Sequence, residues 1–136
     1  MNKIELIKEH EGLRLKPYQC TAGKTTIAFG RNLEDNGIRL DEAEFMLSND
    51  IKECESVLSD RLERWEALSE IRQAVMIDMM YNLGWPRLSK FKKTLAAVND
   101  GYFDRAAAEM LDSRWARQVG QRAITLSDMM KTNNWP

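Results

Sequence analysis

Only one short stretch of this 136-residue chain has the pattern of β-strands, and it limits the fold more than any other feature does. Between Leu13 and Gly37, prolines and glycines separate short β-prone pieces, above all TTIAF at positions 25–29. After Gly37, apolar residues recur at three- and four-residue intervals to the end of the chain, as in amphipathic helices. The sequence therefore predicts an α+β fold with a small sheet of two or three strands near its start.

Apolar spacing and capping residues predict where the helices lie. A short amphipathic helix is expected over residues 3–11, and Gly12 ends it because glycine tolerates left-handed backbone. A long amphipathic helix follows over about 41–60. Ser69 is a suitable N-cap for a helix over 70–83 that is apolar nearly all round, as is typical of the centre of a bundle. Shorter helices are expected at about 89–99, 103–112, 114–119 and 121–131.

These elements predict a single domain over residues 1–136 with two lobes. The small lobe spans about 12–40, and a connecting helix over about 41–60 leads to a helical lobe over about 61–136. We expect the N-terminal helix to pack with the helical lobe. A cleft between two lobes is a usual place for a ligand.

Composition excludes several classes of protein. Hydrophobic residues make up 43% of the chain and charged residues 30%, which is ordinary for a globular protein. No apolar run approaches the roughly 20 residues that span a bilayer. The N-terminal segment MNKIELIKEHEG has charge in every turn, so we expect no signal peptide and a cytoplasmic product. Two cysteines and one histidine favour neither a disulfide framework nor a metal site, and we expect no cofactor.

Three reactive side chains lie close together in the first quarter of the sequence: Glu11, Cys20 and Thr26. A carboxylic acid can donate a proton to a leaving oxygen, and a second group across a cleft can activate water or attack directly. Each residue also has a plain structural interpretation. Glu11 can be a solvated carboxylate at a helix end, Cys20 a small buried hydrophobe, and Thr26 a strand residue.

The spacing of these three residues, with several further segments, resembles the phage-type lysozymes, a family of glycoside hydrolases. The matching segments cover nearly the whole chain in the family's order: HEGLRLKPY, TTIAFGRNL, LDEAEFMLSNDI, IRQAVMIDMMYNLG and SRWARQVGQRA. The resemblance implies a bilobal α+β fold. It also implies hydrolysis of the β-1,4 bond between N-acetylmuramic acid and N-acetylglucosamine in bacterial peptidoglycan.

The resemblance also implies roles for individual residues. Glu11 would be the general acid, Cys20 the group on the opposite face of the sugar, and Thr26 the hydroxyl that positions a water molecule. Substrate contacts would come from four further residues: Asn32, Tyr81, Thr94 and Arg122.

The sequence departs from the family pattern in three places. Cys20 stands where the best-known members have aspartate, although cysteine also fits the family pattern. Arg31 replaces a histidine that is common at this position. The segment between Gly30 and Asp41 is shorter than in the best-known members, which affects substrate-binding detail more than it affects the fold.

The resemblance implies an endolysin that lyses the host cell, acts on peptidoglycan glycan strands and is a monomer. It would stay in the host cytoplasm until another protein opens the membrane. A peptidoglycan-binding homologue that has lost catalysis through the cysteine at position 20 is the alternative. A DNA-binding helical regulator would use the basic late helices, but it leaves TTIAFG unexplained. We therefore expect neither nucleic-acid binding nor stable membrane insertion.

Overall fold

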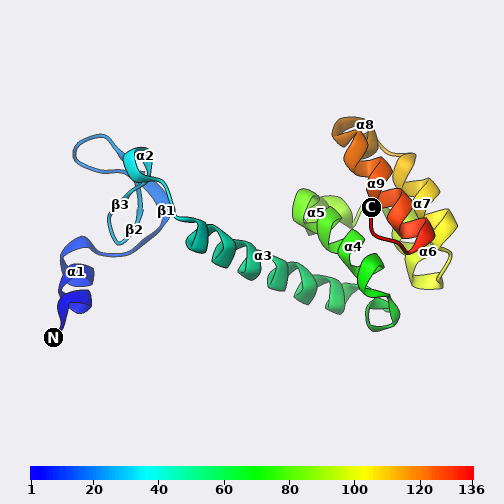
Figure 1. Ribbon diagram of the computed structural model, residues 1–136, viewed down its shortest axis with the longest axis horizontal. Helices are drawn as coiled ribbons and strands as arrows, with labels where there is room; N and C mark the ends of the chain where they lie inside the picture. The colour runs from blue at the N-terminus through cyan, green and yellow to red at the C-terminus, as the bar shows by residue number, and fades with distance from the viewer. The chain divides into compact units, whose positions relative to one another are not determined.

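The computed structural model of the protein covers residues 1–136 and divides into two compact units, Met1–Met46 and Leu47–Pro136. The first unit contains a small antiparallel sheet and the second contains only helices (Figure 1), which confirms the predicted α+β class. Helix α3 (Leu40–Arg61) begins in the first unit and ends in the second. The predicted lobe boundaries, and the packing of the N-terminal helix with the helical lobe, stay predictions. None of the helices is both long and apolar enough to cross a membrane.

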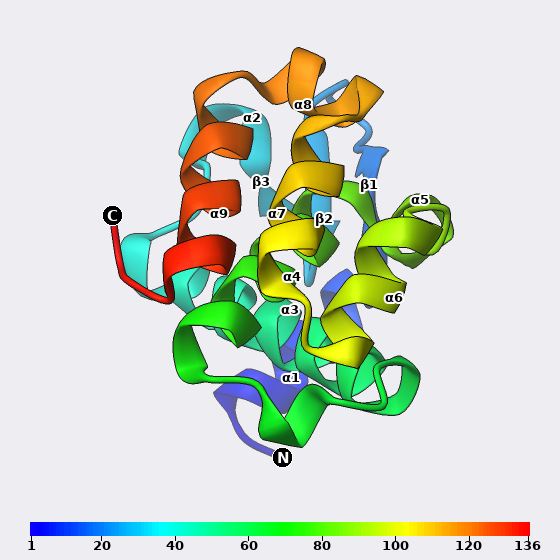
Figure 2. The same ribbon diagram turned by 90° about the vertical axis from the view of Figure 1, so that its right-hand side faces the viewer.

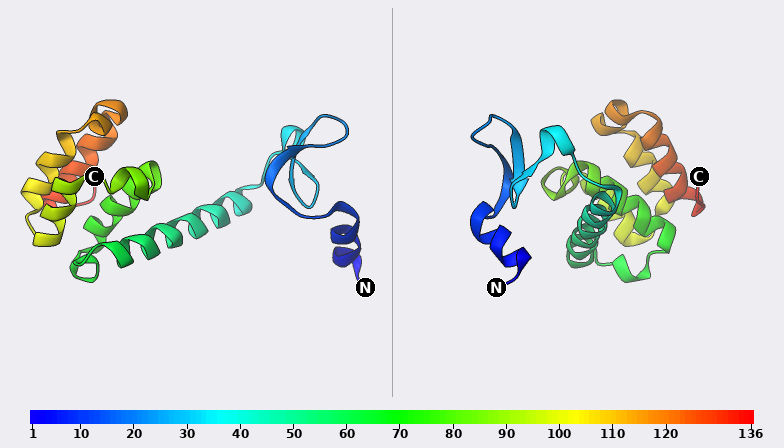
Figure 3. Two further views of the ribbon diagram at one scale, coloured as in Figure 1. Left: turned by 180° about the vertical axis from the view of Figure 1, so that it is seen from behind. Right: turned by 60° about the vertical axis from the view of Figure 1, so that its left-hand side comes forward.

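The small unit follows the predicted order of a helix and then strands, which Figure 3 shows from two sides. Asn2 caps the first helix by accepting hydrogen bonds from the N–H groups of Ile4 and Glu5, and Gly12 ends that helix with φ of 70°. The sheet order is β1-β2-β3, so β2 is the central strand. The elements are α1 (Lys3–Glu11), β1 (Arg14–Gln19), β2 (Thr25–Ala28), β3 (Arg31–Asn32), α2 (Leu33–Asn36) and the first turns of α3.

Strand β1 pairs with β2 regularly only near the loop that joins them. Tyr18 lies opposite Thr26 and Gln19 opposite Thr25, but the register shifts between Arg14 and Tyr18. Pro17 lies within this shifted segment and cannot donate a ladder hydrogen bond, so its place on an edge strand is expected. The regular end of the ladder therefore supports the loop that carries Cys20.

A bidentate ion pair joins the sheet to the start of α3. The two terminal nitrogens of Arg31 lie 2.7 and 2.6 Å from the carboxylate oxygens of Glu42. The same carboxylate accepts the backbone N–H of Arg39 at 2.9 Å, just before the helix begins. Both side chains are about one-third exposed. The guanidinium of Arg31, with the Arg39 N–H next in effect, lowers the pKa of Glu42 to about 2.

The helical unit has one hydrophobic core. Helices α6, α7 and α9 pack side by side, and α4 packs on α9 (Figure 2). The fully buried side chains include Val75, Met76 and Met79 of α4, as the all-round apolar pattern predicts. The elements are η1 (Trp65–Ala67), α4 (Glu70–Leu83), α5 (Trp85–Leu88), α6 (Lys92–Asp100), α7 (Phe103–Leu111), α8 (Arg114–Val119) and α9 (Gln121–Thr132).

Most predicted helices are confirmed, and the differences lie at short elements. Ser69 caps α4 through the N–H of Arg72, and Gly84 ends it with φ of 75°. The short helix α5 follows directly, although Gly84 and Pro86 predict only a break. Pro86 lies in the first turn of α5, where its missing N–H is not needed. Helix α6 begins at Lys92 rather than near residue 89.

A buried leucine and an exposed leucine of the helical unit test this description of the core. Leu88 is fully buried and Leu111 is 45% exposed. Leu88→Ala should lower the free energy of unfolding by about 2–5 kcal/mol, because it removes buried methyl groups and leaves a cavity. Leu111→Ala should lower it by less than about 1 kcal/mol. Urea denaturation of both variants measures the difference, and equal losses would contradict this description of the core.

The Arg31–Glu42 pair predicts a pH dependence. The folded pKa of Glu42 is about 2, below the ordinary value of about 4.3. The pair therefore contributes its stability above that ordinary value, and the contribution is lost as the pH falls toward 2. Glu42→Gln should lose stability at pH 7 and should flatten the fall of the melting temperature between about pH 4.5 and pH 2. An unchanged slope in thermal melts over this range would show that the ion pair does not contribute.

Candidate functional site

Glu11 ends helix α1, and its carboxyl group lies against the turn between β2 and β3. A Cβ atom built on Gly30 would meet the side chain of Glu11, with Cδ at 2.9 Å and one carboxylate oxygen closer still. Gly30 has φ of +76°, which also favours glycine. The Glu11 side chain is exposed, and no hydrogen bond or ion pair within the protein engages its carboxylate. A free carboxyl group thus faces solvent beside a glycine that leaves room for it.

Cys20 and Thr26 meet at one backbone carbonyl. The loop between β1 and β2 turns back at Gly23, whose N–H donates to the Cys20 carbonyl at 2.8 Å. The Lys24 carbonyl accepts the N–H of Cys20 at 3.0 Å and the Thr26 hydroxyl at 2.8 Å. Thr26 is only 3% exposed, while Cys20 is half-buried. The loop therefore brings these two predicted residues together.

The loop also favours the thiolate form of Cys20. The backbone N–H of Lys24, followed by that of Ala22, lowers the pKa of the Cys20 thiol, and partial burial opposes this effect. The Thr26 hydroxyl acts in the same direction as the two N–H groups. It carries a single proton, so it cannot donate to the Lys24 carbonyl and to the sulfur at once. Because the thiolate is the reactive form of cysteine, this environment suits a chemical role.

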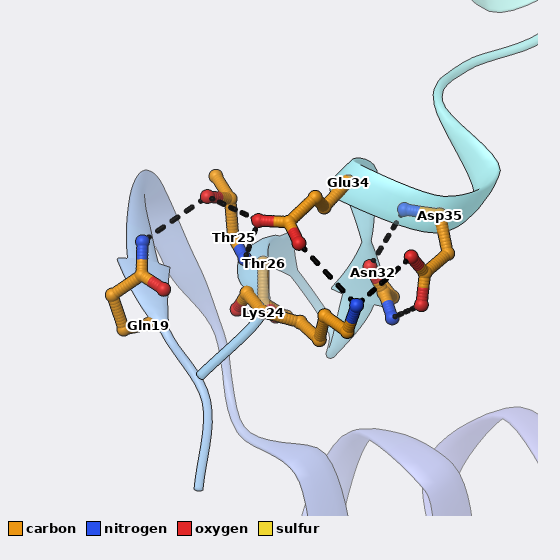
Figure 4. Close-up of polar contacts among 7 residues, drawn as sticks. All are labelled: Gln19, Lys24, Thr25, Thr26, Asn32, Glu34 and Asp35. Carbon is orange, nitrogen blue, oxygen red and sulfur yellow. Dashed lines mark hydrogen bonds and ion pairs between the residues drawn. The ribbon is translucent and has the colours of Figure 1, made fainter. Parts of the chain in front are cut away.

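A polar cluster links the loop to helix α2 (Figure 4). The ammonium group of Lys24 lies 3.4 Å from a Glu34 oxygen and 3.3 Å from an Asp35 oxygen. The Gln19 amide donates to the Thr25 hydroxyl at 3.1 Å, next to the carboxylate of Glu34. These contacts lie around Lys24, whose backbone carbonyl accepts hydrogen bonds from Cys20 and Thr26.

Asn32, a predicted substrate contact, has a local role in the structure. Its side-chain oxygen accepts the N–H of Asp35 at 3.0 Å and so caps helix α2. Its amide nitrogen donates to the Asp35 carboxylate at 2.9 Å (Figure 4). The substrate role of Asn32 stays a prediction.

Tyr81 and Arg122 both belong to the helical unit. The Arg122 guanidinium of α9 donates to the Asp78 carboxylate of α4 at 2.7 Å, and both side chains are about 40% exposed. Tyr81 is one turn further along α4 and is 50% exposed. Residues three apart share a helix face, so Tyr81 lies beside this ion pair. Their roles toward substrate stay predictions.

Thr94 lines a pocket of 560 Å³ in the helical unit, although only 2% of the residue is exposed. The pocket is also lined by Trp115, whose indole N–H donates to the Asn82 side chain at 2.7 Å, and by Phe91, which packs edge-on against that indole. Neither Tyr81 nor Arg122 belongs to its lining. Cations outnumber carboxylates around it: Arg87, Lys90, Lys92, Lys93 and Arg114 against Glu109 and Asp112.

Two residues of this site are not evident in the sequence. Gly30 is recognisable there only as a break between strands, and its place beside Glu11 depends on the β2–β3 turn. No local sequence pattern predicts the ion pairs of Lys24, because its partners Glu34 and Asp35 lie ten and eleven positions later. A Gly-Lys pair between two strand patterns signals only a turn.

The contact between Glu11 and Gly30 leads to a prediction in which Gly23 is the control. Gly23 has the same φ as Gly30, +76°, and open space around it, so Gly23→Ala should cost only the strain of positive φ, about 1–2 kcal/mol. Gly30→Ala should cost up to about 1 kcal/mol more, because its methyl group forces the end of the Glu11 side chain into another rotamer. Chemical denaturation measures both costs.

A double-mutant cycle isolates that contact. Gly30→Ala introduced together with Glu11→Ala should lose the additional cost and keep only the strain. If the two glycine substitutions cost the same in the presence of Glu11, then the carboxyl group is not held in the space beside Gly30.

Comparison with known proteins matches most of this chain to one family. Residues 8–130 match the family described as phage lysozyme. An endolysin from Acyrthosiphon pisum secondary endosymbiont phage 1 is 31% identical over 123 residues, which cover 88% of this chain and 82% of the relative. Probable T4-type lysozyme 2 of Dictyostelium discoideum is 26% identical, with 94% and 92% of the two chains covered. The pre-baseplate central spike protein Gp5 of Enterobacteria phage T4 is 25% identical, over 98% of this chain but only 28% of its own length. With a match that spans its sheet, its long helix and its helical unit, this chain belongs to the phage lysozyme family.

Proposed function

We propose that this protein is an endolysin with muramidase activity, which hydrolyses the β-1,4 bond between N-acetylmuramic acid and N-acetylglucosamine. The observation that carries the proposal is the arrangement of the small unit. A free Glu11 carboxyl group lies beside Gly30, and the backbone N–H of Cys20 and the hydroxyl of Thr26 both donate to one carbonyl of the neighbouring hairpin. Membership of the phage lysozyme family supports the lysozyme reaction for this set of residues.

Glu11 is the proposed general acid. Cleavage of a glycosidic bond requires a proton for the leaving oxygen and stabilisation of a cation-like sugar. The Glu11 side chain is exposed and makes no ion pair in the protein, so a sugar oxygen can reach it. Glycine at position 30 keeps the space that this carboxyl group occupies.

Cys20 and Thr26 are the proposed partners of the acid. A Cys20 thiolate can attack the anomeric carbon, which retains the configuration, or it can activate a water molecule, which inverts it. The Thr26 hydroxyl donates its proton to the Lys24 carbonyl, so its lone pairs are free to accept a hydrogen bond from that water. Family resemblance favours inversion, and NMR of the first-formed product anomer distinguishes the two routes.

The proposed setting is the cell wall of a bacterial host. We propose that the enzyme acts on glycan strands as a monomer after another protein has opened the membrane. The lowered pKa of Cys20 supports catalysis over the alternative of an inactive peptidoglycan-binding protein, because cysteine in this loop is shifted toward its reactive form. A protein of the inactive class would bind purified wall without clearing it.

The proposal predicts opposite results for two substitutions. Glu11→Gln should abolish the clearing of chloroform-treated Gram-negative cells, a loss of about 100-fold or more, because an amide cannot donate the proton. Cys20→Asp should keep the activity. The acidic side of the pH–activity profile of Cys20→Asp should move to lower pH, because a carboxyl group ionises near pH 4 and a thiol near pH 8.5. Turbidity measurements between pH 4 and pH 9 test both results.

Two matched variants control for an unspecific loss of clearing activity. Glu9→Gln changes a carboxylate on the same helix, and Cys54→Ala removes the other thiol, which lies buried in α3. Both should clear cells as the unmodified protein does. Clearing by Glu11→Gln would remove the acid from the mechanism, and full activity of Cys20→Ser would remove the thiol.

A further inference from the structure

Nothing apolar holds the loop between β1 and β2 in place. Thr21, Ala22 and Gly23 are exposed, and Cys20 and Lys24 are only half-buried. The position of this loop therefore depends on its hydrogen bonds and ion pairs. Among them, the contacts of Lys24 engage both Cys20 and Thr26.

Lys24 makes contacts of two kinds. Its backbone carbonyl accepts from the Cys20 N–H at 3.0 Å and from the Thr26 hydroxyl at 2.8 Å. Its side-chain ammonium group lies between two carboxylates of α2, 3.4 Å from Glu34 and 3.3 Å from Asp35. One residue thus joins the proposed reactive groups to a neighbouring helix, and Figure 4 shows the ammonium group of Lys24 beside the two carboxylates of that helix.

The carboxylates that hold Lys24 are themselves positioned. Asp35 accepts the Asn32 side-chain amide at 2.9 Å, and its own N–H donates to Asn32 at 3.0 Å. Glu34 lies at the limit of hydrogen-bond distance from the N–H and hydroxyl of Thr25, both at 3.5 Å. Because these residues sit in the short helix next to the central strand, the ammonium group has a fixed place to bind.

These ion pairs add little to overall stability. The Lys24 side chain is 40% exposed, and its two partners are 49% and 51% exposed. Exposed pairs of this kind contribute between about 0 and 1 kcal/mol, because water and salt screen them. Their effect on geometry is different. A loop without packed side chains moves when its tether is cut, and a misplacement of about 1 Å can reduce a catalytic rate by about 100-fold.

We propose that Lys24 is a positioning residue, whose pairing with Glu34 and Asp35 fixes the carbonyl group that holds the Cys20 backbone and the Thr26 hydroxyl. The proposal rests on the proposed function for the identity of the reactive groups. Lys24 itself does not touch the substrate. Its side chain acts through the backbone, so its loss should change the reaction rate and the reactivity of Cys20 but leave substrate affinity in place.

The test compares Lys24→Met with Lys24→Arg. Methionine keeps the length of the side chain without its charge, and arginine keeps a cation that can reach both carboxylates. In Lys24→Met we expect kcat on soluble peptidoglycan fragments to fall on the order of tenfold and KM to stay within about twofold. Lys24→Arg should restore at least about half of kcat. Arg39→Gln, which breaks the Arg39–Asp41 pair of the same unit, is the control and should leave kcat unchanged.

A second readout follows the thiol directly. In a Cys54→Ala background, Cys20 is the single thiol, and its iodoacetamide alkylation rate as a function of pH reports its apparent pKa. Lys24→Met keeps the backbone N–H groups but releases the loop, so this pKa should rise toward the ordinary thiol value of about 8.5. Lys24→Arg should return it to the value of the single-thiol parent.

The two readouts separate this proposal from the proposed function. An alkylation profile that is unchanged in Lys24→Met overturns the positioning role, as does a loss of kcat that arginine does not rescue. If the parent protein does not cleave peptidoglycan, then the proposed function fails, and the alkylation profile alone decides the role of Lys24. Should Lys24→Met fail to fold in thermal melts, Glu34→Gln combined with Asp35→Asn provides the same test.

Discussion

The small unit depends on polar contacts because 46 residues cannot bury much apolar surface. Thr26 is its one buried residue, and its hydroxyl donates to a backbone carbonyl. The remaining order comes from the strand ladder, from the turn at Gly30, and from ion pairs that join the sheet to neighbouring helices. The Arg31–Glu42 pair ties the sheet to α3, and Lys24 ties the hairpin loop to α2. The residues of the candidate site are therefore held by hydrogen bonds and charges rather than by packing.

The helical unit is held together differently. Its centre is a continuous apolar core, and buried polar contacts are few and specific. The hydroxyl of Ser127 on α9 donates to the Ala107 carbonyl of α7, and the Arg72 guanidinium donates to the Met130 carbonyl near the end of α9. Such a core fixes the positions of residues on the exposed faces of its helices. Tyr81 and the Arg122–Asp78 pair are examples, since both lie on helices whose opposite faces are buried.

Cysteine at position 20 is compatible with the chemistry of the family because of its surroundings. Two backbone N–H groups of the hairpin loop lower the pKa of its thiol, as they would stabilise any anion placed there. Arginine at position 31 is accommodated in a comparable way, since Glu42 supplies a carboxylate for its guanidinium. Both residues that differ from the family pattern, Cys20 and Arg31, are thus matched by contacts within the small unit.

The sequence by itself determined the fold class, the long helices and the glycine that ends α1, and it supplied the proposed set of reactive residues. Helical periodicity and the spacing of Glu11, Cys20 and Thr26 are local features that need no knowledge of distant contacts. Only the tertiary structure decided that Gly30 faces Glu11, that Lys24 joins Cys20 and Thr26 to α2, and that Asn32 caps a helix. The short helices α2 and α5 also escaped prediction, because a single turn has too few residues to show a period. These contacts join residues that the chain brings together only after its turns have formed, and no local pattern records them.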